Sequence, residues 1–310
     1  MDNGILNSLK EQINTVFVGK EEVVGDVLTC LLAGGHILLE DVPGVGKTTL
    51  ARTLAKSLDC SFGRIQFTPD TLPGDVVGMS VYNMKTGEFE YRTGAIMHQM
   101  ILADEINRTS PKTQASLLEA MAEGHVTVDG TNYDLPKPFM VIATQNPVEF
   151  LGTYPLPEAQ MDRFMMRLTI GYPEAEEEVL LAKNYLEDKT VDTIKPVCSE
   201  QEILHLKEQV SLVHVSDAIL QYAQEMIAAT RREKRFVMGA SPRALLHLIA
   251  AARARAFLMG QDFVKPDDVK AVAVNVLHHR LILTSEAKIK TEDCDSILYG
   301  LIVKVKIPME

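Results

Sequence analysis

The sequence predicts an α/β fold with a parallel sheet, followed by a smaller all-helical domain. Up to about residue 170, short apolar runs alternate with segments of helical period, which is typical of a parallel sheet covered by helices. Beyond about residue 185 the pattern is helical only. The change falls within residues 171–195, so we expect a core over residues 1–184 and a lid domain over residues 185–310.

A glycine-rich turn at residues 40–49 (EDVPGVGKTT) separates an apolar run from a helical pattern. Its glycines would let backbone N–H groups surround an anion, and the helix N-terminus would add partial positive charge. We therefore expect a phosphate-binding loop, with Lys47 on the β- and γ-phosphates and the Thr48 hydroxyl on Mg²⁺. Asp41 stands where this motif usually begins with glycine. The alternative is an ordinary Gly/Pro turn.

The remaining core elements follow from apolar periodicity and turn residues. Two hairpins are expected, one across Lys85-Thr86-Gly87 and one across Asp129-Gly130. Ser110-Pro111 is typical of a helix start. The expected helices before the loop span residues 5–16 and 22–33, and the expected strands span residues 36–39, 62–67, 100–103, 139–144 and 165–170.

Polar side chains end two of these strands. Asp104 and Glu105 close the strand at 100–103, at the carboxyl edge where open α/β sheets bind ligands. In a phosphate-loop enzyme, Asp104 would hold Mg²⁺ through its shell, and Glu105 would orient or deprotonate the attacking water. Asn146 follows the strand at 139–144, and its amide could hold that water. The alternatives are two solvated acids and an Asn-Pro turn.

The lid sequence indicates a small helical bundle. Ser241-Pro242 caps the start of a helix that Gly260 ends. Stripes of apolar residues recur at helical spacing, and we attribute them to a packed core rather than to a cofactor site. One such stripe is Ile219, Tyr222, Ala223, Met226 and Thr230, and another is Val269, Val272, Ala273 and Val276.

Charge and composition limit the possible partners and location. The net charge is −11: residues 1–184 hold 25 acidic against 14 basic side chains, and residues 185–310 hold 17 of each. Because nucleic-acid affinity depends on Lys and Arg contacts to phosphates, no nucleic-acid partner is expected. Four scattered cysteines indicate a reducing compartment. With no signal-peptide pattern and no apolar run near ~18 residues, we expect a cytoplasmic protein without a membrane span.

Six motifs together resemble those of the AAA+ ATPases, and among them the MoxR family, over nearly the whole chain. They comprise residues 44–48, 102–108, 111–114, 143–147, 156–164 and 239–244. The resemblance implies a P-loop αβα core whose five-stranded parallel sheet has the order 5-1-4-3-2, with a helical lid. It also identifies residues 72–94 as the helix-two insertion of this clade, and residues 124–137 as the hairpin before the first sensor strand.

The resemblance assigns a role to each candidate site residue. Asn146 is similar to the first sensor and Arg243 to the second, while Arg163, with Asp162 beside it, resembles the arginine finger offered to a neighbouring subunit. For both arginines the alternative is ordinary surface salt bridging. Val18 and Gly19 match the stretch that lines the adenine pocket, Asp104 and Glu105 match Walker B, and Walker A comprises Pro43, Gly44, Val45, Gly46, Lys47, Thr48 and Thr49.

The family implies Mg²⁺-dependent hydrolysis of ATP to ADP by a self-assembled ring, expected to be a homo-hexamer, that remodels client proteins or inserts a metal or cofactor into them. The alternative is a nucleotide-gated switch that binds a partner without mechanical work. A von Willebrand factor A domain protein is the implied partner. Client contacts could come from the apolar side chains of the two hairpins, which could equally pack on their own domain: Met79, Tyr82, Phe89 and Tyr133.

Overall fold

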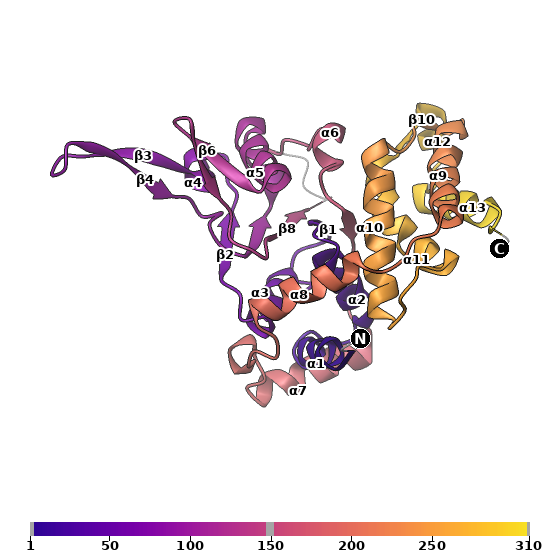
Figure 1. Cartoon of the computed structure of the whole chain (residues 1–310), viewed down its shortest axis with the longest axis horizontal. Helices are drawn as coiled ribbons and strands as arrows, with labels where there is room; N and C mark the ends of the chain where they lie inside the picture. Colours follow the sequence, from indigo (N-terminus) through magenta and orange to yellow (C-terminus); the bar gives the residue numbers. More distant parts are fainter. Residues whose placement is uncertain (1–2, 147–151, 309–310) are drawn as a thin grey trace.

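The computed structural model describes residues 3–146 and 152–308, and its core contains a five-stranded parallel sheet (Figure 1). The strand order is β2-β5-β8-β1-β9. Counted in chain order among these five strands alone, this is 5-1-4-3-2 from the β9 edge, the order that the family resemblance implies. The strands are β1 (Ile37–Glu40), β2 (Phe62–Gln66), β5 (Met100–Asp104), β8 (Met140–Gln145) and β9 (Met166–Leu168).

Helices cover both faces of the sheet because successive strand residues point to opposite sides. Leu39 and Leu102 pack with one group of helices, whereas Leu38 and Ala103 pack on the other face with α5 (Pro111–Glu123). The first group comprises α1 (Asn3–Asn14), α2 (Glu21–Leu32) and α3 (Lys47–Ser57). Three shorter or later core helices are α4 (Pro73–Val77), α6 (Glu158–Met161) and α7 (Ala175–Leu186).

Both expected hairpins are present. β3 (Gly78–Asn83) pairs with β4 (Glu88–Thr93) and projects from the core, and β6 (His125–Val128) pairs with β7 (Thr131–Asp134) (Figure 1). Tyr82 and Phe89 make an edge contact with each other but stay 52% and 73% exposed. Tyr133 instead stacks on Tyr91, with ring centroids 3.9 Å apart. The first hairpin therefore presents apolar side chains to solvent, while Tyr133 packs on its own domain.

The lid is helical except for one short antiparallel pair that corrects the expectation of helices alone. β10 (Phe236–Met238) pairs with β11 (Ile282–Leu283). Strands of three and two residues are too short to show a period in the sequence, so the long-range pairing alone reveals them. The helices of residues 185–310 are α8 (Glu200–Ser211), α9 (Asp217–Arg232), α10 (Pro242–Leu258), α11 (Pro266–Leu277), α12 (Ser285–Ile289) and α13 (Cys294–Lys304), with a 3₁₀ turn η3 at His278–Arg280.

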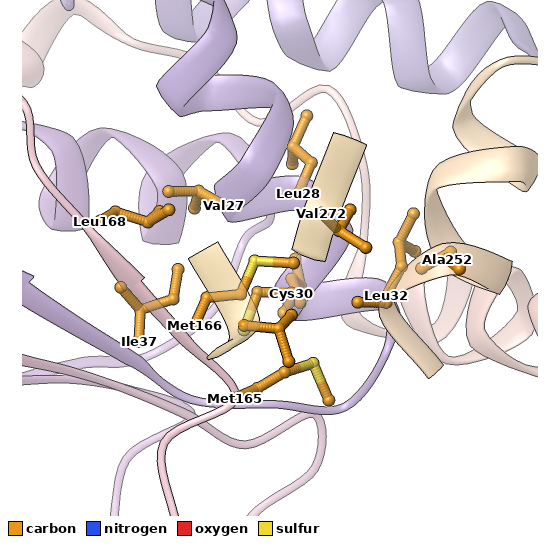
Figure 2. Close-up of a cluster of buried hydrophobic side chains, with 14 of the residues drawn as sticks. Val27, Leu28, Cys30, Leu32, Ile37, Met165, Met166, Leu168, Ala252 and Val272 are labelled. Atoms are coloured by element: carbon orange, nitrogen blue, oxygen red, sulfur yellow. The ribbon is translucent and has the colours of Figure 1, made fainter. Parts of the chain in front are cut away.

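One hydrophobic cluster joins the core to the lid. Figure 2 shows Leu28 of α2 and Met166 of β9 together with Ala252 of α10 and Val272 of α11, all of them buried. The lid is thus packed on the sheet edge that β9 forms rather than tethered by a linker alone. In the described ranges, no helix combines the length and the apolar character needed to cross a membrane.

Candidate active site

The phosphate loop begins after β1 and ends where α3 starts at Lys47. Gly44 and Gly46 have φ values of +90° and +96°, which favour glycine, and a Cβ on Gly46 would lie 3.2 Å from a ring carbon of Phe17. Thr48 and Thr49 occupy the first turn of α3, where backbone N–H groups have no intrahelical partner. This turn therefore offers N–H donors to an anion, as the motif predicts.

Lys47 lies close to the acidic residues that the sequence singles out. Its Nζ donates a hydrogen bond to the carbonyl oxygen of Asp41 at 2.7 Å. Burial lowers the pKa of Lys47, and the nearby negative charges of Asp41, Asp104 and Glu105 oppose that shift. The ammonium of Lys47 and the carboxylates of Asp104 and Glu105 thus share one electrostatic environment.

Asp41, in the place of the usual first glycine, has a structural partner that the sequence does not show. Its Oδ1 accepts from the N–H of Val42 at 3.0 Å, and its Oδ2 accepts from the N–H groups of Ile170 at 2.6 Å and Gly171 at 2.8 Å. The predicted strand at 165–170 therefore ends at Leu168. The N–H of Ile170 bonds to the loop carboxylate instead of extending the ladder.

The carboxylate of Asp104 has two side-chain partners. Its Oδ1 accepts from the Thr144 hydroxyl at 2.7 Å, and its Oδ2 pairs with the Arg64 guanidinium at 2.6 Å. Thr144 belongs to β8 and Arg64 to β2, the two strands that flank β5. The strand order therefore fixes the side chain of Asp104 from both sides.

Glu105 adopts a left-handed backbone conformation, with φ of +56°. Its N–H donates to the Thr144 hydroxyl at 2.9 Å, and its Oε2 accepts from Gln66 Nε2 at 3.1 Å and lies 3.3 Å from Arg108 Nε. Gln66 and Arg64 are polar positions on β2 that the sequence did not mark as functional. The alternation of Arg64 and Gln66 with buried residues of β2 can be seen in the sequence. The position of β2 beside β5 cannot, because it depends on the strand order of the sheet.

Asn146 lies at the same edge of the sheet. It follows β8 directly, and the N–H of Asp41 bonds to the preceding carbonyl, that of Gln145, at 3.3 Å. Its side chain is buried. The structure thus brings Asn146 beside the phosphate loop, while Pro147 of the same motif lies outside the described residues.

A cavity of about 210 Å³ borders the phosphate loop, and Val18, Val45, Gly171 and Leu181 are among its lining residues. Gly19 lies next to it, where the carboxylate of Glu177 approaches so closely that a Cβ on residue 19 would overlap with it. Larger hollows, of about 490 and 620 Å³, lie on the lid. Because no phosphate-loop residue lines either of them, the smaller cavity is the candidate adenine pocket.

Arg163 lies at the opposite edge of the sheet from Lys47. β9 runs parallel to β1, and the N–H of Met165 bonds to the carbonyl of His36, the residue before β1 begins. Arg163 therefore precedes both strands, whereas Lys47 follows β1. A strand of four residues spans roughly 13 Å. Arg163 is thus not brought to the phosphate loop of its own chain.

Arg243 lies with Arg163 rather than with Lys47. Its guanidinium is 3.5 Å from a carboxylate oxygen of Asp162, the residue before Arg163. The hydroxyl of Ser241, which caps α10, donates to the same carboxylate at 3.0 Å. The two arginines are consequently held near one another at the amino edge of the sheet, away from Lys47 and Asp104 at the carboxyl edge.

The residues at the carboxyl edge suit Mg²⁺ bound together with a nucleotide. No group of three or more His, Cys, Asp or Glu side chains forms a ready-made metal site in the described parts of the chain. Thr48 and Asp104 offer one hydroxyl and one carboxylate close to the loop. Mg²⁺ in nucleotide sites takes one or two protein oxygens and completes its shell with phosphates and water, so this sparse set fits.

Comparison with known proteins places the chain among ATPases. Residues 36–166 match the model of the ATPase family associated with various cellular activities (AAA), and residues 228–298 match that of the AAA lid domain. Protein YeaC of Bacillus subtilis is 49% identical over 99% of this chain and 96% of its own. Chaperone MoxR1 of Mycobacterium tuberculosis is 40% identical over 96% and 81%. A crystal structure from Cytophaga hutchinsonii superposes with a TM-score of 0.92, at 39% identity, over 99% of this chain and 96% of that one.

Proposed function

Since the chain belongs to the MoxR family of AAA+ ATPases, we propose that it binds ATP at residues 43–49 and hydrolyses it to ADP and phosphate. The observation that carries this proposal is the meeting of Lys47, Asp104, Glu105 and Asn146 at one edge of the sheet, beside N–H groups of α3.

Each residue has a part that follows from its chemistry. Lys47 and the N–H groups of the loop neutralise phosphate charge in a partly buried site. Glu105 takes the proton of the attacking water, which the Asn146 amide orients. Thr48 and Asp104 would hold Mg²⁺, which supplies further charge neutralisation on the phosphates. The cavity beside Val18 and Gly19 would receive the adenine base.

The test measures nucleotide binding and turnover in matched pairs of variants. Lys47→Ala should abolish both, whereas Lys56→Ala, in the last turn of the same helix, should leave both unchanged. Glu105→Gln should keep binding and lower kcat about 10²-fold or more, since a positioned general base contributes that much. Glu123→Gln, exposed at the end of α5, is its control. Native turnover by Glu105→Gln would remove Glu105 as the base.

We further propose that the protein works as a ring of identical subunits, a hexamer, in which Arg163 and Arg243 act on the neighbour's nucleotide. The support is their place at the edge of the sheet opposite Lys47. Head-to-tail contacts that close into a ring would join the two edges. Turnover per subunit should rise with protein concentration as rings form, and sedimentation should show assembly with ATP. Full turnover by a monomer would contradict this assembly.

We propose that the ring remodels a client protein in the manner of a chaperone, or inserts a metal or cofactor into it. We place this activity in the cytoplasm, where the four free cysteines of the chain would stay reduced. The relative named Chaperone MoxR1 and the exposed Tyr82 and Phe89 of the projecting hairpin support this role. A protein with a von Willebrand factor A domain is the proposed partner.

Co-purification with the Glu105→Gln variant from its own cells tests the partner. Phe89→Ser should reduce client recovery without changing basal turnover, and Lys85→Ser in the turn of the same hairpin is the control. A nucleotide-gated switch would show partner exchange between ATP and ADP with no change in the client's structure. Recovery of the same proteins by the Phe89→Ser variant would remove the hairpin from the contact.

A further inference from the structure

We propose that Arg280, a buried arginine of the lid, positions the Arg163 finger of its own subunit for the neighbour's active site. The inference rests on the proposed action of Arg163 in trans. Arg280 ends the η3 turn, and its side chain is only 2% exposed. The two residues lie far apart in sequence, and Arg280 contacts the chain on both sides of Arg163 without touching the finger itself.

The contacts of Arg280 bracket the finger. Nε donates to Asp162 Oδ1 at 2.7 Å, and one terminal nitrogen donates to the carbonyls of Asp162 at 3.0 Å and Phe164 at 2.6 Å. The other terminal nitrogen donates to the carbonyl of Met165 at 3.3 Å. The backbone is therefore held before Arg163 and after it by one rigid guanidinium.

The same lid surface adds further bonds to this segment. His279 Nε2 donates to the carbonyl of Phe164 at 3.1 Å, and Ser241 and Arg243 share the carboxylate of Asp162. Arg163 has no such restraint on its own side chain, because its guanidinium makes no ion pair with any residue that the structure describes. The direction of the finger is thus set through its backbone.

A purely structural role would not call for arginine here. Burial lowers the pKa of Arg280, and the hydrogen bond and negative charge of Asp162 oppose that shift. Apolar residues of similar size often stabilise such positions as well as a buried ion pair does. A planar fork of five donors, however, fixes several acceptors in one geometry, which no apolar side chain or lysine can do. The arrangement suits a segment whose exact orientation matters.

The test is complementation between two variants whose turnover is lowered for different reasons. Arg280→Gln should lower kcat at least 10-fold, with the affinity for ATP within twofold of native, because its own phosphate loop is intact. Glu105→Gln lacks the base but keeps a native finger. In an equal mixture, about a quarter of the subunit interfaces should join the intact site of an Arg280→Gln subunit to the native finger of a Glu105→Gln subunit. The mixture should therefore regain about a quarter of native turnover.

Controls separate this inference from the proposed function. Arg163→Ala mixed with Glu105→Gln should regain the same turnover, and Arg163→Ala mixed with Arg280→Gln should regain none. If the Arg163→Ala mixture recovers but the Arg280→Gln mixture does not, the positioning role is wrong and the finger in trans stands. If neither recovers, the finger in trans fails and the inference fails with it.

A second variant guards against misfolding of Arg280→Gln. Asp162→Asn keeps the shape of the carboxylate but weakens its bond to Arg280 Nε, and it should show the same complementation by Glu105→Gln. Arg255→Gln, a lid arginine with no bond to residues 162–165, should keep native turnover. Native kcat in folded Arg280→Gln protein, or in Asp162→Asn, would overturn the proposal.

Discussion

The carboxylate of Asp41 accepts a hydrogen bond from the N–H of Gly171 at 2.8 Å, so a side chain of the phosphate loop holds the segment that follows β9. It also accepts from the N–H of Ile170 at 2.6 Å. We expect Asp41→Ala to lower the free energy of unfolding by about 2–4 kcal/mol, because each buried N–H left unsatisfied costs roughly 1–3 kcal/mol.

Urea unfolding measures this loss. Asp70→Ala, at an exposed position, should change the free energy of unfolding by no more than about 0.5 kcal/mol. Asp41→Asn should fall between native and Asp41→Ala, since it keeps one acceptor oxygen. Equal stability of Asp41→Ala and native protein would mean that the two N–H groups find other acceptors.

Gln66 holds the carboxylate of Glu105 through a hydrogen bond of 3.1 Å. Loss of this hydrogen bond should leave the Glu105 carboxylate more available to water, so we expect Gln66→Ala to raise kcat. The increase should be about fivefold, which corresponds to the net energy of one hydrogen bond, about 1 kcal/mol. KM should stay within twofold. Steady-state kinetics measure both, with Gln201→Ala, at an exposed position of α8, as the control. A fall in kcat would show instead that Gln66 holds Glu105 in its active orientation.

His36 is buried and neutral. The N–H of Val141 donates to Nδ1 at 3.0 Å, so Nε2 carries the proton and donates to the carbonyl of Met121 at 3.2 Å. Burial lowers the pKa of His36 from 6.5 to about 4. The unfolded chain therefore takes up a proton that the folded chain does not, and stability is lost as pH falls from about 6.5 towards 4.

At pH 5 this single group should cost about 2 kcal/mol of stability relative to pH 7. His36→Asn should reduce the difference between the free energies of unfolding at the two pH values by that amount. The exposed His205→Gln should leave the difference unchanged. An identical pH dependence in His36→Asn and native protein would assign the effect to other groups, such as buried His279.

Met166 lies in the hydrophobic cluster that joins the sheet edge to the lid (Figure 2). Because it is fully buried, we expect Met166→Ala to lower the free energy of unfolding by about 2–5 kcal/mol through lost contacts and a residual cavity. Leu212→Ala, at a residue 80% exposed, should change it by no more than about 0.5 kcal/mol. Thermal or urea unfolding measures the stability of both variants. Similar losses in the free energy of unfolding for Met166→Ala and Leu212→Ala would contradict a packed junction between core and lid.

Local sequence by itself determined the elements and the chemistry of the loop. The turn at Gly46 requires a positive φ, and Lys47 follows it at the start of α3, so residues close in sequence decide this geometry. Asp129-Gly130 set a tight turn, and Ser241 caps α10 through the N–H of Ala244. In each case the decisive contact spans only a few residues, which is why the sequence predicts it.

Only the tertiary structure decided which of these groups meet. Asp104 receives Arg64 because β2 lies beside β5, and Arg163 stands away from Lys47 because β9 runs parallel to β1. Arg280 reaches Asp162 across 118 residues of chain. A buried charge must find its partner wherever packing brings one, and packing of strands and lid is a property of the whole chain. The sequence contained both partners, and the fold alone made them neighbours.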